Sequence, residues 1–233
     1  MKTKKTIIAL LFACSPFAAS AQDSLDVNLE LDFVSQYIWR GLKQGHVSVQ
    51  PEVGLSWKGL SLSAWGSYSF NSKDPVELDL TLSYQTGGLS MGVVDYWMSD
   101  NDSRFFYFKL PNTGHAFEAF VGYDFGPISA SWQTVFAGND LLESDGRRTY
   151  SSYLELTAPF RLAKCDWEAT VGIVPWKAAY YETNGFAVTN VSIGATKDIR
   201  ITDSFSIPLF ATLIANPAEQ KLYFVGGLTI ALP

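Results

Sequence analysis

The feature that most constrains the fold is an alternation of apolar and polar residues, first seen in residues 26–41, DVNLELDFVSQYIWRG. Apolar side chains occupy the odd positions from Val27 to Trp39, with Ser35 the one gap, and most even positions, including Arg40, are polar. Only a β-strand separates alternate residues onto two faces. The run is longer than a usual strand of about 5–6 residues. It matches a tilted membrane-crossing strand of about 9–11 residues with an overhang.

The same alternation recurs along the chain and predicts twelve strands. Their expected ranges are 26–41, 47–57, 60–71, 76–86, 89–98, 115–125, 128–137, 150–160, 164–175, 186–197, 205–216 and 221–232. Short connections alternate with longer ones, as in outer-membrane barrels with short periplasmic turns and longer extracellular loops. We therefore predict an all-β fold, a transmembrane antiparallel up-and-down β-barrel of twelve strands.

The strand expected at 89–98 is less regular than the others, because its parity places Asp95 on the apolar face. A β-bulge near Val93 and Val94 would turn Asp95 inward. The sequence thus predicts a bulge in this strand.

A soluble barrel also alternates, but it buries its apolar face. The membrane form is favoured here because the apolar face is almost free of charge and the polar face is rich in Ser, Thr, Gly, Gln and acids. The aromatic residues of the apolar face also collect at the two strand ends, as expected at two membrane interfaces. They are Trp57, Tyr84, Phe125, Phe160, Trp167 and Phe205 at the short turns, and Tyr37, Trp39, Tyr68, Phe70, Phe117 and Phe136 at the long loops.

The first residues have the composition of a secretory signal peptide: a basic start, an apolar run at 6–13 and the small residues Ala19-Ser20-Ala21. We predict cleavage of residues 1–21, which leaves 22–233 as a single barrel domain in the outer membrane. Lipidation at Cys14 is the alternative. Cleavage would remove three lysines and no acidic residue, so the formal net charge would fall from −6 to −9.

An acidic chain is a poor partner for nucleic acid. The expected partners are membrane lipids, the outer-membrane insertion machinery and small solutes. One departure concerns insertion: bacterial barrels commonly end in an aromatic residue, whereas this chain ends Ile230-Ala231-Leu232-Pro233.

The polar face carries many acidic side chains, with Arg40 as its one clear cation. The candidate lumen-lining and selectivity residues are Arg40, Glu30, Asp32, Glu52, Glu77, Asp79, Glu118, Glu155, Asp166 and Glu168. Carboxylates in a narrow pore concentrate cations and repel anions, so the sequence predicts a cation-preferring channel. The alternative is that these acids only solvate the interior. A more specific hypothesis pairs Arg40 with Glu77 or Glu118 at a constriction near the outer rim.

Twelve strands lie between about eight, which leave a filled interior, and 16–18, which leave an open channel. Large side chains on the inward parity would fill much of the lumen: Trp65, Phe120, Tyr153, Phe210 and Tyr223. We expect a narrow pore for small solutes, with a gated or plugged barrel, or an accessory barrel of a larger complex, as the alternatives.

Two long loops carry further candidates. Loop 99–114 holds Asp100 and Asp102, which suggest a calcium contact, but two loop acids are more often only solvated. We therefore predict no metal and no cofactor. Its FFYF run could fold into the mouth, extend a hairpin or contact a partner. Loop 176–185 carries aromatic residues of a type that stacks on sugars, although packing at the membrane interface explains them more simply.

A lipid hydrolase on the barrel wall is the enzymatic alternative. Acyl hydrolysis needs a base bonded to a nucleophile and oriented by a third group. The chain has two histidines, His46 in the first loop and His115 on the lipid side near the outer rim, and no G-x-S-x-G motif. We predict no catalytic residues and no enzyme activity.

Three early segments carry a family resemblance: SQYIWRG (35–41), WKGLSLSAWGSYSF (57–70) and VELDLTLSYQTGGLSMGVVDYW (76–97). They resemble the S-x-Y-x-x-RG opening, the W-G-S segment and the E-x-D strand of the TorF-type porin family. The resemblance is specific over about residues 35–97. It implies a bacterial outer-membrane β-barrel, and it assigns no catalytic or ligand residues.

Overall fold

The computed structural model describes residues 25–99, 104–142, 145–203 and 205–232. The expected signal peptide and Cys14 lie outside the described residues, and so do Asp100 and Asp102. Cleavage after Ala21 and the calcium contact therefore remain predictions.

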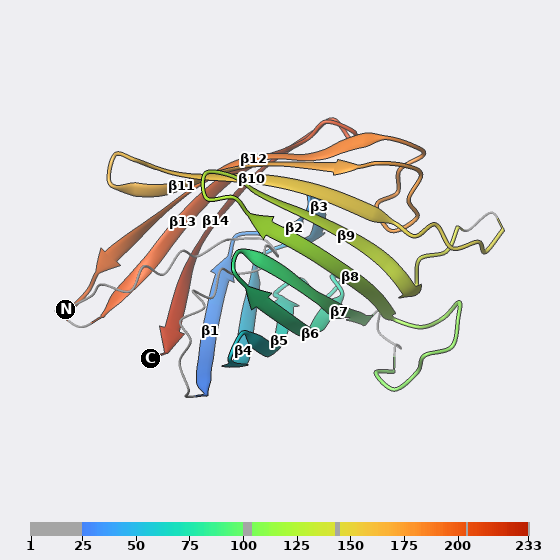
Figure 1. Ribbon diagram of the computed structural model, residues 1–233, viewed down its shortest axis with the longest axis horizontal. Coiled ribbons are helices and arrows are strands. Elements are labelled where there is room, and N and C mark those ends of the chain that lie inside the picture. Colours follow the sequence, from blue (N-terminus) through green and yellow to red (C-terminus); the bar gives the residue numbers. More distant parts are fainter. Residues whose placement is uncertain (1–24, 100–103, 143–144, 204, 233) are drawn as a thin grey trace.

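Twelve of the strands in the described residues close into one antiparallel barrel (Figure 1). Strands that follow one another around the chain pair with each other, and β1 closes the barrel between β14 and β4. The barrel strands are β1 Asp26–Val34, β4 Ser48–Trp57, β5 Leu60–Ser69, β6 Val76–Thr86, β7 Leu89–Ser99, β8 His115–Asp124, β9 Ser129–Gly138, β10 Ser152–Leu162, β11 Cys165–Val174, β12 Ala187–Arg200, β13 Ser206–Asn216 and β14 Lys221–Leu232. The predicted all-β fold, an antiparallel up-and-down barrel of twelve strands, is confirmed.

One end of the barrel carries the short connections, such as Lys58-Gly59 and Gly87-Gly88, and is called the turn end here. The other carries the longer segments and is called the loop end. Within the part of the chain that the structure describes, no helix is long and apolar enough to cross a membrane.

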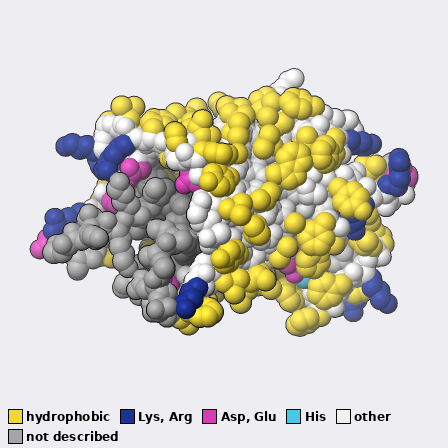
Figure 2. Space-filling model, in the orientation of Figure 1, with side chains coloured by type: hydrophobic (Ala, Val, Ile, Leu, Met, Phe, Trp, Pro, Cys, Tyr) yellow, Lys and Arg dark blue, Asp and Glu magenta, His cyan; other side chains and the backbone are white. Residues whose placement is uncertain are grey.

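The outer surface is apolar over most of its extent. Along β6, Leu80 and Leu82 point outward and are 38% and 47% exposed, whereas Glu77 and Asp79 point inward and are buried. Figure 2 shows hydrophobic side chains spread across the displayed face. Both predicted aromatic sets contribute exposed rings: Trp57, Tyr84, Phe125, Phe160 and Phe205 at the turn end, and Tyr68, Phe70 and Phe136 at the loop end.

The first predicted strand, 26–41, is wrong beyond Val34. The chain leaves the barrel wall there and turns inward as a hairpin of β2, Tyr37–Trp39, and β3, Leu42–Gly45. Tyr37 and Trp39 were expected on the outer face, at the membrane interface beside the long loops. They are instead 7% and 4% exposed and belong to a cluster of buried side chains inside the barrel, the interior cluster. Alternation cannot reveal this bend, because the hairpin continues the period of two.

The hairpin turns at Arg40 and Gly41, whose φ angles are 49° and 82°. Two successive positive φ values are typical of the tight turns that match the twist of paired strands. A Cβ on Gly41 would lie 1.8 Å from the carbonyl oxygen of Thr189, so the turn packs directly on the backbone of β12. The side-chain amide of Asn216 also donates to the Gly41 carbonyl at 3.1 Å. These contacts hold the turn inside the barrel.

The predicted bulge in β7 is also wrong. β7 pairs without a register shift with both β6 and β8. Asp95 therefore stands between Leu80 and Phe117, which both belong to the outer face. Its carboxylate stays outside the barrel wall rather than turning into the lumen.

The segment 175–186, which joins β11 to β12, folds inward as well. Ala178 and Tyr181 are each 1% exposed in the interior cluster, and Tyr180 packs against it. The expectation of membrane-interface packing is wrong for Tyr180 and Tyr181. Trp176 stays at the outer surface, 43% exposed, with its ring 5.7 Å from that of Trp132.

Candidate functional site

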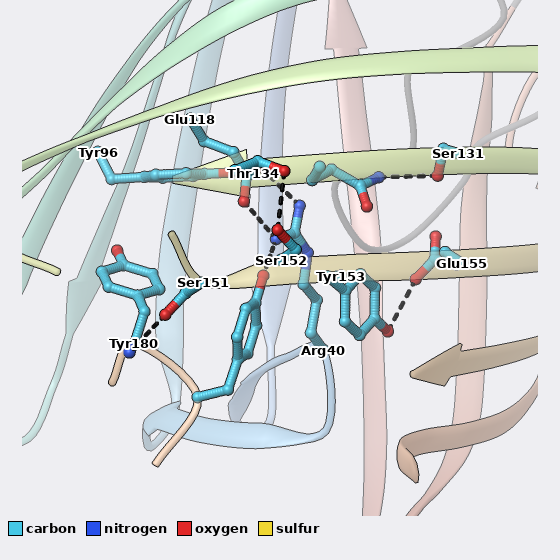
Figure 3. Close-up of polar contacts among 12 residues, drawn as sticks. Arg40, Tyr96, Glu118, Ser131, Thr134, Ser151, Ser152, Tyr153, Glu155 and Tyr180 are labelled. Atoms are coloured by element: carbon cyan, nitrogen blue, oxygen red, sulfur yellow. Dashed lines mark hydrogen bonds and ion pairs between the residues drawn. The ribbon is translucent and has the colours of Figure 1, made fainter. Parts of the chain in front are cut away.

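A buried ion pair crosses the lumen near the loop end (Figure 3). Arg40 donates to Glu118 through both terminal nitrogens, at 2.6 Å and 2.8 Å, so two N–H groups meet two carboxylate oxygens. The Tyr96 hydroxyl donates to the same carboxylate at 2.9 Å, and Arg40 also donates to the Tyr181 hydroxyl. One of the two pairings expected from the sequence, Arg40 with Glu118, is therefore present. Bidentate geometry of this kind is among the strongest that a side-chain pair can adopt.

Aromatic rings enclose the Arg40 guanidinium. Its central carbon lies 4.4 Å from the centroid of the Trp39 ring and 4.7 Å from that of Tyr153. Trp39 and Tyr181 stack with their centroids 5.5 Å apart. A cation over a ring face is attracted by the ring quadrupole. The Arg40 guanidinium therefore holds together the inserted hairpin, the barrel wall and segment 175–186, because each of them contributes a ring to its surroundings.

Segment 175–186 is anchored by a second polar network. Asp140, 1% exposed, accepts hydrogen bonds from the hydroxyl and backbone N–H of Ser151 and from the Thr149 hydroxyl. Thr149 and Ser151 in turn accept from the backbone N–H groups of Ala179 and Tyr180, each at 3.0 Å. The carboxylate of Asp140 thereby fixes the residues that place Tyr180 and Tyr181 in the lumen.

The predicted lumen acids fall into two groups along the barrel. Near the loop end Glu77, Asp79, Glu118 and Glu155 are buried. In the middle and toward the turn end Glu30, Asp32, Glu52 and Glu168 are partly exposed, and Asp166 is exposed. Of these acids the structure places only Glu118 beside Arg40. That the acids line a pore and set its selectivity stays a prediction.

The partly exposed acids are close to one another. Glu30 stands directly opposite Glu52 in the register of β1 and β4. Asp32 accepts a hydrogen bond from the Thr229 hydroxyl, and Asp166 lies 3.7 Å from Arg161. This part of the lumen wall therefore presents an excess of carboxylates to the interior.

The expected large inward side chains do line the lumen. Tyr153 and Phe210 are buried, and Trp65, Phe120 and Tyr223 are partly buried against the two interior clusters. Sequence reasoning missed Tyr180, Tyr181 and Asp140, which come from loops. The pair Arg40-Gly41 was the available signal for the hairpin, because a residue that tolerates positive φ followed by glycine favours a tight turn.

A separate polar site lies on the outer face. His115 is fully buried although its strand parity points outward, because segment 104–113 folds over the outside of the wall. Its Nδ1 lies 2.8 Å from Asp95 Oδ1, and its Nε2 contacts the carbonyl oxygen of Phe105. The ring stacks on Phe108 at 4.4 Å and on Phe117 at 5.9 Å.

This arrangement differs from a hydrolytic one, because Nε2 of His115 faces the backbone carbonyl of Phe105 and not a nucleophilic side chain. The FFYF run therefore neither enters the mouth nor extends a hairpin. It covers a histidine–carboxylate pair on the outer wall.

The other histidine belongs to a loop network. The Asp74 carboxylate accepts from the Ser69 hydroxyl at 2.6 Å and from the His46 backbone N–H at 2.7 Å, and it lies 2.9 Å from His46 Nδ1. Desolvation by burial alone would raise the pKa of Asp74, but these hydrogen bonds outweigh it and lower the pKa to about 2. The network joins the end of β3 to the loop between β5 and β6.

No protein-family model matches the chain, and no curated protein matches it. Among solved structures, the NanC porin is similar with a TM-score of 0.48 and 8% identity over 89% of this chain and 100% of that chain. An outer membrane channel from Pseudomonas putida F1 gives a TM-score of 0.47 and 14% identity over 94% of this chain and 99% of that chain. Values this low show neither family nor activity. The TorF-type resemblance therefore stays a prediction, and the function proposed below depends on the barrel itself.

Proposed function

We propose that this protein is exported through its cleavable leader to the bacterial outer membrane, where it forms a narrow, cation-preferring channel for small solutes. The observation that carries the proposal is a closed barrel that is apolar outside and acidic inside. Closure matters because a membrane offers the backbone no hydrogen-bond partners, so a sheet that crosses it cannot leave an open edge.

The outer surface supports the membrane location. Contiguous apolar surface of this extent is rare on soluble monomers, and the exposed rings at both strand ends suit the two membrane interfaces. A soluble barrel would need another layer of protein over this surface.

The lumen supports the cation preference. Glu30, Glu52 and Glu168 face an interior whose one buried cation in the described residues, Arg40, is already neutralised by Glu118. Fixed carboxylates in a confined aqueous path favour cations over anions.

The filled loop end favours a second candidate, a closed or gated barrel. The β2–β3 hairpin and segment 175–186 pack their aromatic rings together across the loop end of the lumen. Solutes would pass only when one of these segments moves, so the protein would be gated or would act as an accessory barrel.

The test is the current through purified, refolded protein in a planar bilayer under a salt gradient. Reproducible steps with a cation-selective reversal potential are expected, and Glu52→Gln should move that potential toward zero. Glu182→Gln, which neutralises an exposed loop acid, serves as the control. Anion selectivity would contradict the proposal, and a silent but folded barrel would favour the accessory role.

A further inference from the structure

Segment 104–113, RFFYFKLPNT, lies against the outside of the barrel wall near the loop end. The ring of Phe108 stacks on the buried His115 at 4.4 Å and on Phe117 at 6.5 Å. Phe117 belongs to the outer face of β8, and its ring lies 6.4 Å from that of Phe136 on β9. The segment therefore sits at the same level as the exposed aromatic rings of the loop end.

The side of the segment that faces away from the wall is apolar. Phe106 is 88% exposed, Phe108 55% and Leu110 46%. Large apolar side chains gathered in this way mark a surface that meets another apolar phase or a partner. Because the barrel wall around the segment is apolar as well, these side chains continue the surface that the membrane would cover.

The same segment carries two cations and no acidic residue, although the whole chain has a formal net charge of −6. Arg104 and Lys109 are both exposed, and neither forms an ion pair within the part of the chain that the structure describes. The guanidinium carbon of Arg104 lies 4.9 Å from the centroid of the Tyr107 ring. Figure 2 shows Lys and Arg side chains among hydrophobic ones at the end of the molecule where Figure 1 places this loop.

We propose that segment 104–113 binds an anionic lipid of the leaflet at the loop end. Arg104 and Lys109 would contact the lipid phosphate, because basic residues at a membrane surface attract anionic headgroups. Their aliphatic stems let the charges reach the headgroup level from an apolar surface. Phe106 and Leu110 would lie along the acyl chains.

A lipid fits this surface better than a soluble anion or a protein partner. A soluble anion would account for the two cations but not for the exposed rings beside them. A protein partner would have to cover a surface that is continuous with the outer wall of the barrel, where the proposed function already places lipid.

The inference rests on the proposed membrane location and adds a class of lipid to it. It also gives the segment a reason to stay folded over the wall. Phe108 contacts His115 on one side and is exposed on the other, so a lipid bound on the exposed side would favour the folded-over position.

Native mass spectrometry of the folded protein from neutral detergent micelles tests the proposal, because it counts bound lipid molecules. Phosphatidylglycerol is titrated against phosphatidylcholine with the same acyl chains, whose headgroup has no net charge. The wild type should bind phosphatidylglycerol at least fivefold more tightly, since one basic residue near an anionic headgroup contributes about a fivefold gain. The double variant Arg104→Gln with Lys109→Gln should lose this preference.

Two further variants separate the contributions of charge and apolar contact. Phe106→Ser should weaken the binding of both lipids and leave the preference between them, because it removes an apolar contact and no charge. Lys164→Gln is the matched control, since it removes an exposed lysine from the turn between β10 and β11 at the opposite end of the barrel. It should bind both lipids as the wild type does, and heat-modifiable migration on gels shows that each variant is folded.

Equal affinity of the wild type for the two lipids would overturn the inference, and so would an equal loss of preference in Lys164→Gln. Displacement of phosphatidylglycerol by the same concentration of inorganic phosphate would also overturn it, because the surface would then recognise free phosphate. Currents recorded in pure phosphatidylcholine bilayers keep the two proposals apart. Cation-selective current without a lipid preference would leave the channel and remove the lipid site, and a lipid preference without current would do the reverse.

Discussion

Arg40 and Glu118 lie 78 residues apart in the sequence, yet they meet in a two-pronged ion pair inside the barrel, with Nη1 2.6 Å from Oε2. Arg40 sits at the tip of the inserted hairpin and Glu118 on the wall strand β8. The pair therefore joins the inserted hairpin to the barrel wall. Both side chains are at most 5% exposed, so neither charge has water as a substitute partner.

Arg40→Ala is expected to loosen the loop end of the barrel. The change leaves Glu118 buried without its cation, and breaking a buried pair in this way costs about 3–5 kcal/mol. We expect a lower unfolding midpoint and a larger single-channel conductance or weaker ion selectivity, measured in urea titrations and planar bilayers.

The double variant Arg40→Met with Glu118→Gln separates charge from packing. Replacing a buried ion pair by neutral groups of similar volume is often close to neutral, so much of the lost stability should return. Currents in Arg40→Ala identical to the wild type would show that the pair does not constrict the lumen.

Asp140→Asn should release segment 175–186 from the lumen. The carboxylate accepts three hydrogen bonds from Thr149 and Ser151, and the loss of charge-assisted bonds costs about 1.5–3 kcal/mol each at most. Faster amide hydrogen exchange is expected at residues 178–183, together with a larger conductance.

Asp145→Asn is the control for this effect. Asp145 lies close in the chain and pairs with Arg147, but its side chain is 38% exposed, and exposed pairs contribute little. Equal exchange rates in the two variants would contradict the anchoring role of Asp140.

The barrel could be predicted from the sequence because the same alternation recurs in each strand. Each strand places apolar side chains outward and polar ones inward, so twelve short segments independently indicate the same fold. Even an error of one residue at a strand end leaves the parity of Glu77 or Glu155 unchanged. The face that each acid occupies can therefore be predicted from the sequence alone.

The interior of the loop end could not be predicted in the same way. Tyr37 and Trp39 continue the alternation of β1, so parity assigns them to the lipid face although the chain has already left the wall. Tyr180 and Tyr181 come from a connection, where no period exists. Asp95 is an exception to the alternation of β7, and the strand has no bulge that would turn it inward. Its carboxylate stays on the outer face, where it contacts His115 under the folded-over segment 104–113.

Asp95→Asn should weaken the cover of segment 104–113 over the outer wall. The carboxylate lies within 2.8 Å of His115 Nδ1, and that ring carries the Phe105 and Phe108 contacts of the segment. Trypsin should then cut faster after Arg104 and Lys109 in the folded protein. Asp124→Asn, on the same barrel but exposed at the turn end, should leave these rates unchanged. Resistance equal to the wild type would show that the aromatic stacking alone holds the segment.

The hydrogen bonds around Asp74 should make the loop between β5 and β6 sensitive to acid. The pKa of Asp74 is about 2 in the folded protein, against an ordinary value of 3.8. Desolvation by burial raises this pKa, but the hydrogen bonds from Ser69 and His46 to the charged carboxylate lower it by more. A depressed carboxyl pKa contributes stability that is complete above about pH 4 and is lost as the pH falls through about 2. Asp74→Asn should therefore lower the free energy of unfolding at pH 7, and the difference from the wild type should shrink between pH 4 and pH 2.

Urea unfolding of both proteins across that range, followed by tryptophan fluorescence, measures the effect. A difference that stays constant with pH would mean that Asp74 contributes through shape rather than charge.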